Sequence, residues 1–248
     1  ETSTLQQQFE DRGYHVAAHG DPADLAVINT CTVTENGDAE TRRLVNRIQR
    51  RSPGTAIALI GCHAQMQSEA LAAMPGVNWV VGNGAKMELP DLIAANPAGD
   101  KAHIDIREIS AEPFRVHTSR GSRDRTRANL KIQDGCDFYC FFCVIPYTRG
   151  HARSRQFDDL LREAAELVDA GHREIVLTGV NIGTYEDGSK AFLDVVDALI
   201  AQPGLDDIEV REVSPQVVVV VEVMSGSSWT ALEGIRFDFP APATGRIT

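Results

Sequence analysis

The chain has 248 residues, enough for one or two domains with a real hydrophobic core, which excludes a small scaffold held by disulfides. Hydrophobic residues make up 43% and charged residues 24%, which argues against wholesale disorder. The longest uncharged apolar runs, 56–60 and 217–221, are far shorter than the about 20 residues that span a bilayer, so we expect no membrane segment. No basic and apolar leader opens the chain, and it begins at Glu1 without a methionine. We therefore expect a cytoplasmic protein and a fragment of a longer one.

The charge is distributed unevenly along the chain. The formal net charge of −11, taken alone, argues against a polyanionic partner. Between Lys101 and Arg155, however, eleven Lys or Arg residues stand against six Asp or Glu. Two interpretations stay open for this segment, a solvated linker or a face that binds nucleic acid. The candidate RNA contacts are Arg115, Arg120, Arg123, Arg125 and Arg127.

The first hundred residues alternate short apolar runs with helical patterns. The apolar runs end in turn residues, as buried parallel strands do, and predict strands at 25–29, 56–61 and 79–82. Leu44, Val45 and Ile48 recur at helical spacing, and a second short helical pattern follows Pro90. Residues 1–100 are therefore predicted to form an α/β sandwich around a parallel sheet.

Residues 96–127 lose this periodicity and gather Pro, Gly, Ser and Arg, so we expect a basic linker at 101–127. The alternation of strand and helix patterns starts again at Ala128 and predicts right-handed βαβ units in a second domain, 128–213. After Pro215 the pattern breaks, and the valine run is either one more buried strand or an exposed aggregation hazard. We treat 214–248 as an atypical tail. The elements expected in the second domain are strands at 128–133, 174–178 and 207–213 and helices at 157–170 and 191–201.

Three of the five cysteines form a C-x3-C-x2-C pattern, Cys136, Cys140 and Cys143, in the loop after the first strand of the second domain. A disulfide uses only two thiols, and a reducing compartment disfavours it, so the spacing indicates a metal or a cluster. Zinc usually takes paired C-x2-C elements and four ligands, and no close fourth cysteine follows. An iron–sulfur cluster held by three cysteines keeps one iron open for a small molecule to chelate. Buried structural thiols are the remaining interpretation.

The other two cysteines, Cys31 and Cys62, each follow a predicted strand. They are therefore expected at the carboxyl ends of neighbouring parallel strands, the edge where α/β sheets place their ligands. Two thiolates cannot saturate a cluster, so either a further ligand comes from elsewhere or both residues fill the core.

Residues 131–146, which contain the cysteine loop, and the arginine-rich stretch 149–155 resemble the core signature of the radical S-adenosylmethionine (SAM) methylthiotransferases. Segments of the first domain, among them 28–34 and 61–65, resemble the amino-terminal domain of the same family. Residues 32–38 are similar to the enzymes that modify N6-threonylcarbamoyladenosine in tRNA, more than to those that act on isopentenyladenosine or on a ribosomal protein. The fold implied is an α/β sandwich followed by an incomplete partial (β/α) barrel.

The resemblance implies that Cys136, Cys140 and Cys143 hold a [4Fe–4S] cluster whose open iron binds S-adenosylmethionine. One electron then cleaves the cofactor to a 5′-deoxyadenosyl radical, which removes hydrogen from C2 of the adenine, while the protein orients the reactants. Cys31 and Cys62 would be two of three ligands of a second cluster. The residues implied to line the cofactor pocket are Phe142, Gly179 and Asn181.

The implied function is methylthiolation of C2 of N6-threonylcarbamoyladenosine next to the anticodon of a tRNA. The implied enzyme is a cytoplasmic monomer that receives electrons from a flavodoxin or a ferredoxin. In this family the third amino-terminal cysteine would lie before Glu1, and about three of six βα units are present, so we expect that the chain as given cannot insert sulfur. Two alternatives stay open, a non-catalytic iron–sulfur or zinc module and a methylthiotransferase acting on a ribosomal-protein side chain.

Overall fold

The computed structural model describes residues 2–17, 21–31, 35–116, 127–172, 174–202, 208–213 and 218–223. The chain divides into two compact units, and the cysteine loop belongs to the first of them. Among the residues that the structure describes, no helix is both long enough and apolar enough to cross a bilayer. The first unit contains Glu1–Glu112, His117–Arg120 and Asp134–Arg153, and the second contains Pro113–Val116, Gly121–Gln133 and Ser154–Thr248.

The first unit is built on a parallel sheet of four strands in the order β1-β2-β3-β4. The strands predicted at 25–29 and 56–61 are confirmed, and the third begins two residues earlier than the sequence indicated. The fourth strand was not predicted, because its three residues include a His and an Asp. The bounds are β1 (Leu25–Thr30), β2 (Ala56–Gly61), β3 (Val77–Val81) and β4 (His103–Asp105).

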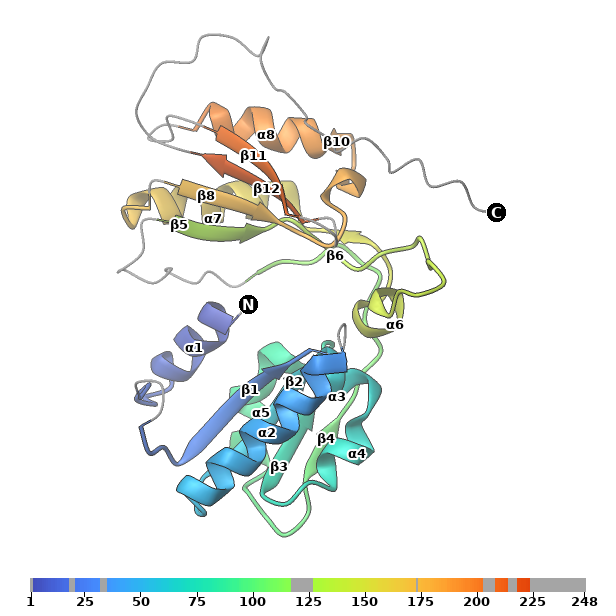
Figure 1. The fold of residues 1–248 in the computed structure, drawn as a ribbon. Coiled ribbons are helices and arrows are strands. Elements are labelled where there is room, and N and C mark those ends of the chain that lie inside the picture. Colours follow the sequence, from blue (N-terminus) through green and yellow to red (C-terminus); the bar gives the residue numbers. More distant parts are fainter. Residues whose placement is uncertain are drawn as a thin grey trace. The chain divides into compact units, whose positions relative to one another are not determined.

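Helices cover both faces of this sheet (Figure 1). Alternate residues of β2 point to opposite faces, so Ala58 and Ile60 share one core with α1 and α5, while Ile57 and Leu59 share the other with α2 and α4. The predicted helices around Leu44 and after Pro90 are confirmed as α2 and α5. The bounds are α1 (Thr2–Asp11), α2 (Glu35–Arg51), α3 (Cys62–Met66), α4 (Ser68–Ala72), η1 (Lys86–Glu88) and α5 (Leu89–Ala95).

The second unit contains a sheet in the order β11-β12-β8-β5. The strands β5 (Arg127–Lys131) and β8 (Glu174–Thr178) are parallel and are joined through the crossover helix α7 (Phe157–Asp169), as the sequence predicted. The valine run forms β12 (Val218–Val223), which lies antiparallel between β8 and β11 (Ile208–Val213). Only four residues separate β11 from β12, too few for a parallel crossover, which needs a dozen or more. The third predicted strand therefore does not pair with β8 directly.

The core of the second unit lies between the sheet and the helices α7 and α8 (Phe192–Ile200). Leu130 and Leu177 from the sheet are fully buried there with Leu160 of α7 and Leu199 of α8. Both helices agree with their predicted spans to within one residue at each end. The remaining short elements of the chain are β6 (Gln133–Asp134), α6 (Ile145–Arg149), β7 (Arg153–Ser154), η2 (Ile182–Thr184), β9 (Glu186–Asp187) and β10 (Lys190–Ala191).

A buried ion-pair network fixes the start of α7. Arg155 is fully buried, its Nε donates to Asp159 Oδ2 at 2.7 Å, and its Nη1 pairs with Glu163 one turn further along. The Tyr185 hydroxyl donates to the Arg155 carbonyl at 2.8 Å, and burial first of all raises the pKa of that hydroxyl. Arg162 reaches Asp159 from the solvent side at 2.6 Å. A cation buried without these carboxylates would be very costly, so the network is a structural unit.

Candidate functional site

The loop that carries Cys136, Cys140 and Cys143 runs between β6 and α6 of the first unit and has an ordered root. The Cys136 amide donates to the Gly150 carbonyl at 3.2 Å, which joins the two ends of the loop. The Cys143 amide donates to the Cys140 carbonyl at 2.9 Å, which closes a turn between these two cysteines. Gly135 has φ +73°, and a Cβ there would overlap the His151 carbonyl, so only glycine fits this approach.

Asp134 acts as an ionic clamp at this root. Its carboxylate is almost fully buried, and it accepts from Arg149 Nη1 at 2.9 Å and from Arg153 Nη2 at 3.1 Å. Asp134 Oδ1 also accepts from the Gly135 amide at 3.0 Å. The aspartate precedes the cysteines and both arginines follow them, so these charge-assisted bonds fix the two ends of the loop.

The tip of the loop is exposed and aromatic. Phe141 is fully exposed and Phe142 is 90% exposed, although phenylalanine is normally buried. Phe138 and Tyr139 are also exposed, and Tyr139 has the left-handed φ of 45°. An apolar group of this size outside the core is typical of a surface that covers a ligand or a partner. The predicted contact of Phe142 with the cofactor stays a prediction.

The second pair of cysteines lies at one edge of the first sheet, as the sequence predicted. Thr30 and Gly61 are register partners on β1 and β2, and Cys31 and Cys62 are the residues that follow them. The Thr30 hydroxyl donates to the Ile60 carbonyl at 2.6 Å and accepts from the Ala64 amide at 3.3 Å, which fixes α3 against the strand end. Cys62 is buried and Cys31 is exposed.

Asn83 links this sheet edge to the cysteine loop, and no role was predicted for it from the sequence. Its side-chain amide donates to Cys62 Sγ at 3.4 Å and to the Thr148 carbonyl of α6 at 2.7 Å. Lys86 Nζ donates to Asn83 Oδ1 at 3.0 Å, and the Asn83 backbone amide donates to Gln65 Oε1 at 2.9 Å. The feature of the sequence that could have identified Asn83 is its position just after β3, since β3 ends at the same sheet edge as β1 and β2.

None of the five cysteines, all of which the structure describes, is part of a disulfide. Among the described residues, no three His, Cys, Asp or Glu side chains lie close enough together to hold a metal ion. The fit to a cluster therefore rests on the chemistry of the donors. Thiolates are the ligands that iron–sulfur clusters take, and one loop supplies three of them. Cys140 is exposed and Cys136 and Cys143 are partly exposed, so all three are open to a ligand.

The predicted cofactor residues Gly179 and Asn181 lie in the second unit, in the turn after β8. The buried Gln133 side chain accepts from the Val180 amide at 2.9 Å and from the Asn181 amide at 2.8 Å. A Cβ on Gly179 would come within 2.5 Å of Ile182 Cγ2, so the turn needs glycine for packing. The turn is ordered at the carboxyl end of a parallel strand, and its role toward a cofactor stays a prediction.

The predicted RNA contacts of the linker are only partly described. Arg115 is exposed, and Arg127 is the first residue of β5, where it is the register partner of Glu174. Arg120, Arg123 and Arg125 lie outside the described residues.

Two known families match separate parts of this chain. Residues 1–82 match the uncharacterized protein family UPF0004, and residues 130–223 match the radical SAM superfamily. The second match contains the cysteine loop, so the protein is of the radical SAM class.

A threonylcarbamoyladenosine tRNA methylthiotransferase from Bacillus subtilis is 34% identical over 90% of this chain and 51% of its own length. A tRNA-2-methylthio-N(6)-dimethylallyladenosine synthase from Sphingopyxis alaskensis is 39% identical over 79% of this chain and 44% of its own. The chain belongs to the radical SAM methylthiotransferase family.

The chain spans about half the length of the curated relatives it matches. A solved structure of a radical SAM methyltransferase from Kitasatospora setae aligns at 14% identity with a TM-score of 0.48, over 73% of this chain and 45% of that chain, a likeness too distant to inform the site.

Proposed function

We propose that this chain provides the cluster-binding and cofactor-binding part of a tRNA methylthiotransferase that acts on C2 of N6-threonylcarbamoyladenosine. The observation that carries the proposal is the loop of three free thiols, with a clamped root and an exposed aromatic tip. Relatives from Bacillus subtilis, Chlamydia pneumoniae and Aquifex aeolicus bear the name of that activity at 31 to 35% identity.

In this proposal Cys136, Cys140 and Cys143 hold a [4Fe–4S] cluster, and Phe142, Gly179 and Asn181 contact S-adenosylmethionine. When bound, these groups supply a carbon-centred radical that can remove hydrogen from the adenine C2. Asp134 holds the loop root through Arg149 and Arg153, and the aromatic tip keeps water from the reacting atoms.

The amino-terminal thiols have a separate part in the proposal. Cys31 and Cys62 contribute to a second cluster, and Asn83 donates a hydrogen bond to the Cys62 sulfur. Hydrogen bonds to cluster sulfurs are one of the means by which a protein sets a reduction potential. The electrons come from a one-electron carrier such as a flavodoxin or a ferredoxin, and the protein works as a cytoplasmic monomer.

One specific alternative concerns the nucleoside. The relative from Sphingopyxis alaskensis, at 39% identity, is named for N6-dimethylallyladenosine. The two nucleosides share the adenine C2 and differ only in the group on N6, so the proposed hydrogen abstraction at C2 fits both.

The test uses hydrogen abstraction as its readout. The chain is reconstituted anaerobically with iron and sulfide, then given S-adenosylmethionine, dithionite and an anticodon stem-loop RNA with deuterium at C2 of the modified adenosine. With N6-threonylcarbamoyladenosine in the RNA, we expect deuterium in the 5′-deoxyadenosine, detected by mass spectrometry. The matched RNA with N6-dimethylallyladenosine should give unlabelled product.

Each other outcome contradicts a defined part of the proposal. Label from the dimethylallyl RNA alone would assign the other nucleoside. Unlabelled 5′-deoxyadenosine with both RNAs would mean that neither adenosine is the substrate of this chain. A reconstituted protein that binds zinc, remains colourless and leaves the cofactor intact would be a non-catalytic metal-binding module.

A further inference from the structure

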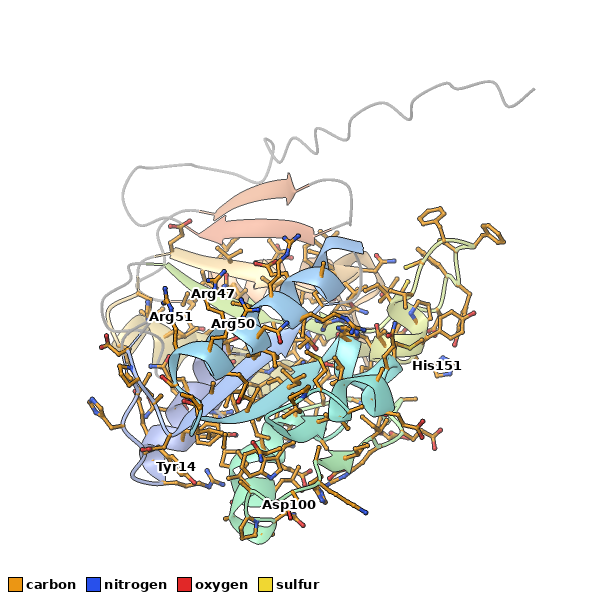
Figure 2. All side chains as sticks on the ribbon, turned by 60° about the horizontal axis from the view of Figure 1, so that its bottom comes forward. Tyr14, Arg47, Arg50, Arg51, Asp100 and His151 are labelled. Atoms are coloured by element: carbon orange, nitrogen blue, oxygen red, sulfur yellow. The ribbon has the colours of Figure 1, made fainter. Side chains whose placement is uncertain are left out.

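The helix α2 carries a concentration of positive charge that the proposed chemistry does not use. Between residues 39 and 51 the sequence has five arginines and no lysine, against one glutamate, in a chain of net charge −11. All five arginines are exposed, and Figure 2 shows Arg47, Arg50 and Arg51 on this helix. The set consists of Arg42, Arg43, Arg47, Arg50 and Arg51.

Four of the five arginines gather on the side of α2 that faces away from the sheet. Val45 and Ile48 of the same helix pack with Ile57 and Leu59 in the core. At 3.6 residues per turn, the four arginines from position 43 onward fall within about 100° of the helix circumference, and Val45 lies on the opposite side. They extend over about 12 Å along the axis, at 1.5 Å per residue. The fold of the first unit therefore holds this basic face in place.

Among the side chains that the structure describes, no carboxylate neutralises this face. In the described part of the structure, none of the five arginine side chains has a hydrogen bond or an ion pair with another residue. Arg12 and Arg107 differ, since Arg12 pairs with Asp91 at 2.8 Å and Arg107 pairs with Asp105 at 2.7 Å. Guanidinium groups left without a partner are available to an external anion, and they match phosphate through two parallel N–H bonds.

We propose that this basic face of α2 binds the phosphate backbone of RNA, an inference that rests on the proposed function for its choice of partner. An anionic membrane surface fits less well, because a helix that lies on a membrane must present apolar side chains to it. The apolar side chains of α2 face the sheet, and the described exposed large hydrophobic residues include none from this helix. Backbone contacts position an RNA without reading its bases, so the face should bind modified and unmodified stem-loops equally well.

The test compares two triple variants of the full 248-residue chain that lose the same charge. One is Arg47→Gln with Arg50→Gln and Arg51→Gln, because glutamine preserves helix propensity. The control is Arg12→Gln with Arg107→Gln and Arg162→Gln, whose arginines are already paired with carboxylates. Affinity for an unmodified anticodon stem-loop is measured between 50 and 300 mM salt, on variants whose melting temperatures confirm that they are folded.

We expect the α2 variant to bind about tenfold or more weakly at low salt, and its log–log salt slope to be smaller by roughly 2 to 3, since each lost phosphate contact removes about 0.7 to 0.9. The control should keep the wild-type slope. An unchanged slope and affinity in the α2 variant would overturn the inference, as would equal losses in both variants.

A parallel measurement with vesicles of anionic phospholipid distinguishes the alternative partner. Loss of vesicle binding without loss of RNA binding would contradict the RNA assignment. The RNA used here carries no modified adenosine and no cofactor is added. A failure of this experiment is thus distinguishable from a failure of deuterium transfer, which tests the proposed function alone.

Discussion

The arginines near the cysteine loop and the arginines of α2 have the same side chain in opposite surroundings. Arg149 and Arg153 share the buried carboxylate of Asp134, and Arg155 is fully buried between two acids. The arginines of α2 are exposed, and within the described residues they have no carboxylate partner. Paired arginines hold elements of the fold together, whereas arginines without a partner can bind an external anion. A count of charges along the sequence does not separate these two roles.

The largest loss of stability is expected when the buried cation Arg155 is removed. Arg155→Met should lower the free energy of unfolding by about 3 to 5 kcal/mol, because the buried Glu163 would lose its cation and Asp159 would keep only the exposed Arg162. Urea unfolding of the chain measures this loss as a lower midpoint.

The control for that variant is Arg162→Gln, which removes a cation at the exposed end of the same network. An exposed ion pair is worth about 0 to 1 kcal/mol, so this variant should unfold close to the wild type. Equal losses in the two variants would mean that burial does not set the importance of these ion pairs.

A smaller effect is expected at the root of the cysteine loop. Asp134→Asn keeps the shape of the side chain and removes the charge that Arg149 and Arg153 share. Each charge-assisted hydrogen bond is worth about 1.5 to 3 kcal/mol, so local opening should increase on the order of tenfold or more. Hydrogen exchange at the Cys136 amide, which donates to Gly150, reports that opening directly.

The matched variant is Asp137→Asn, because Asp137 pairs only with the exposed His151 ring at 2.7 Å among the contacts described. Its loop amides should exchange as in the wild type. If Asp134→Asn leaves the exchange of Cys136 unchanged, the ionic clamp does not hold the root.

The smallest effect is the pH dependence of the buried network. Burial would raise the pKa of Asp159, but hydrogen bonds from Arg162, the Val116 amide and Arg155 outweigh it, and the pKa lies below its usual value of 3.8. A carboxylate with a lowered pKa in the folded state stabilises the protein above pH 3.8, and this contribution is lost as the pH falls through the folded value. The stability advantage of the wild type over Asp159→Asn should therefore be largest at neutral pH and shrink in acid. A difference independent of pH would contradict this assignment.

Local pattern predicted much of the fold and part of the site. The apolar runs placed β1, β2 and β8 to within a residue, and the order of strands placed Cys31 and Cys62 at one sheet edge. The helix α1 was missed because its two core residues, Leu5 and Phe9, are separated by glutamines. The place of β12 between β8 and β11 depends on long-range pairing, which no local pattern encodes.

The electrostatic part of the site was not predictable from the sequence. Asp134 and its arginines are 15 and 19 residues apart, and the Asn83 contact with Thr148 joins residues 65 apart. The arginines of α2 are visible in the sequence, but only the structure shows which arginines already have partners.

The central claim is that the cysteine loop binds a redox cluster that cleaves S-adenosylmethionine. Its most direct test is the amount of 5′-deoxyadenosine formed by the anaerobically reconstituted chain after reduction, measured together with the visible absorbance. We predict that the wild-type chain is brown and cleaves the cofactor, and that Cys140→Ala loses both properties, because the cluster lacks a ligand. Cofactor cleavage that persists in Cys140→Ala would contradict the account.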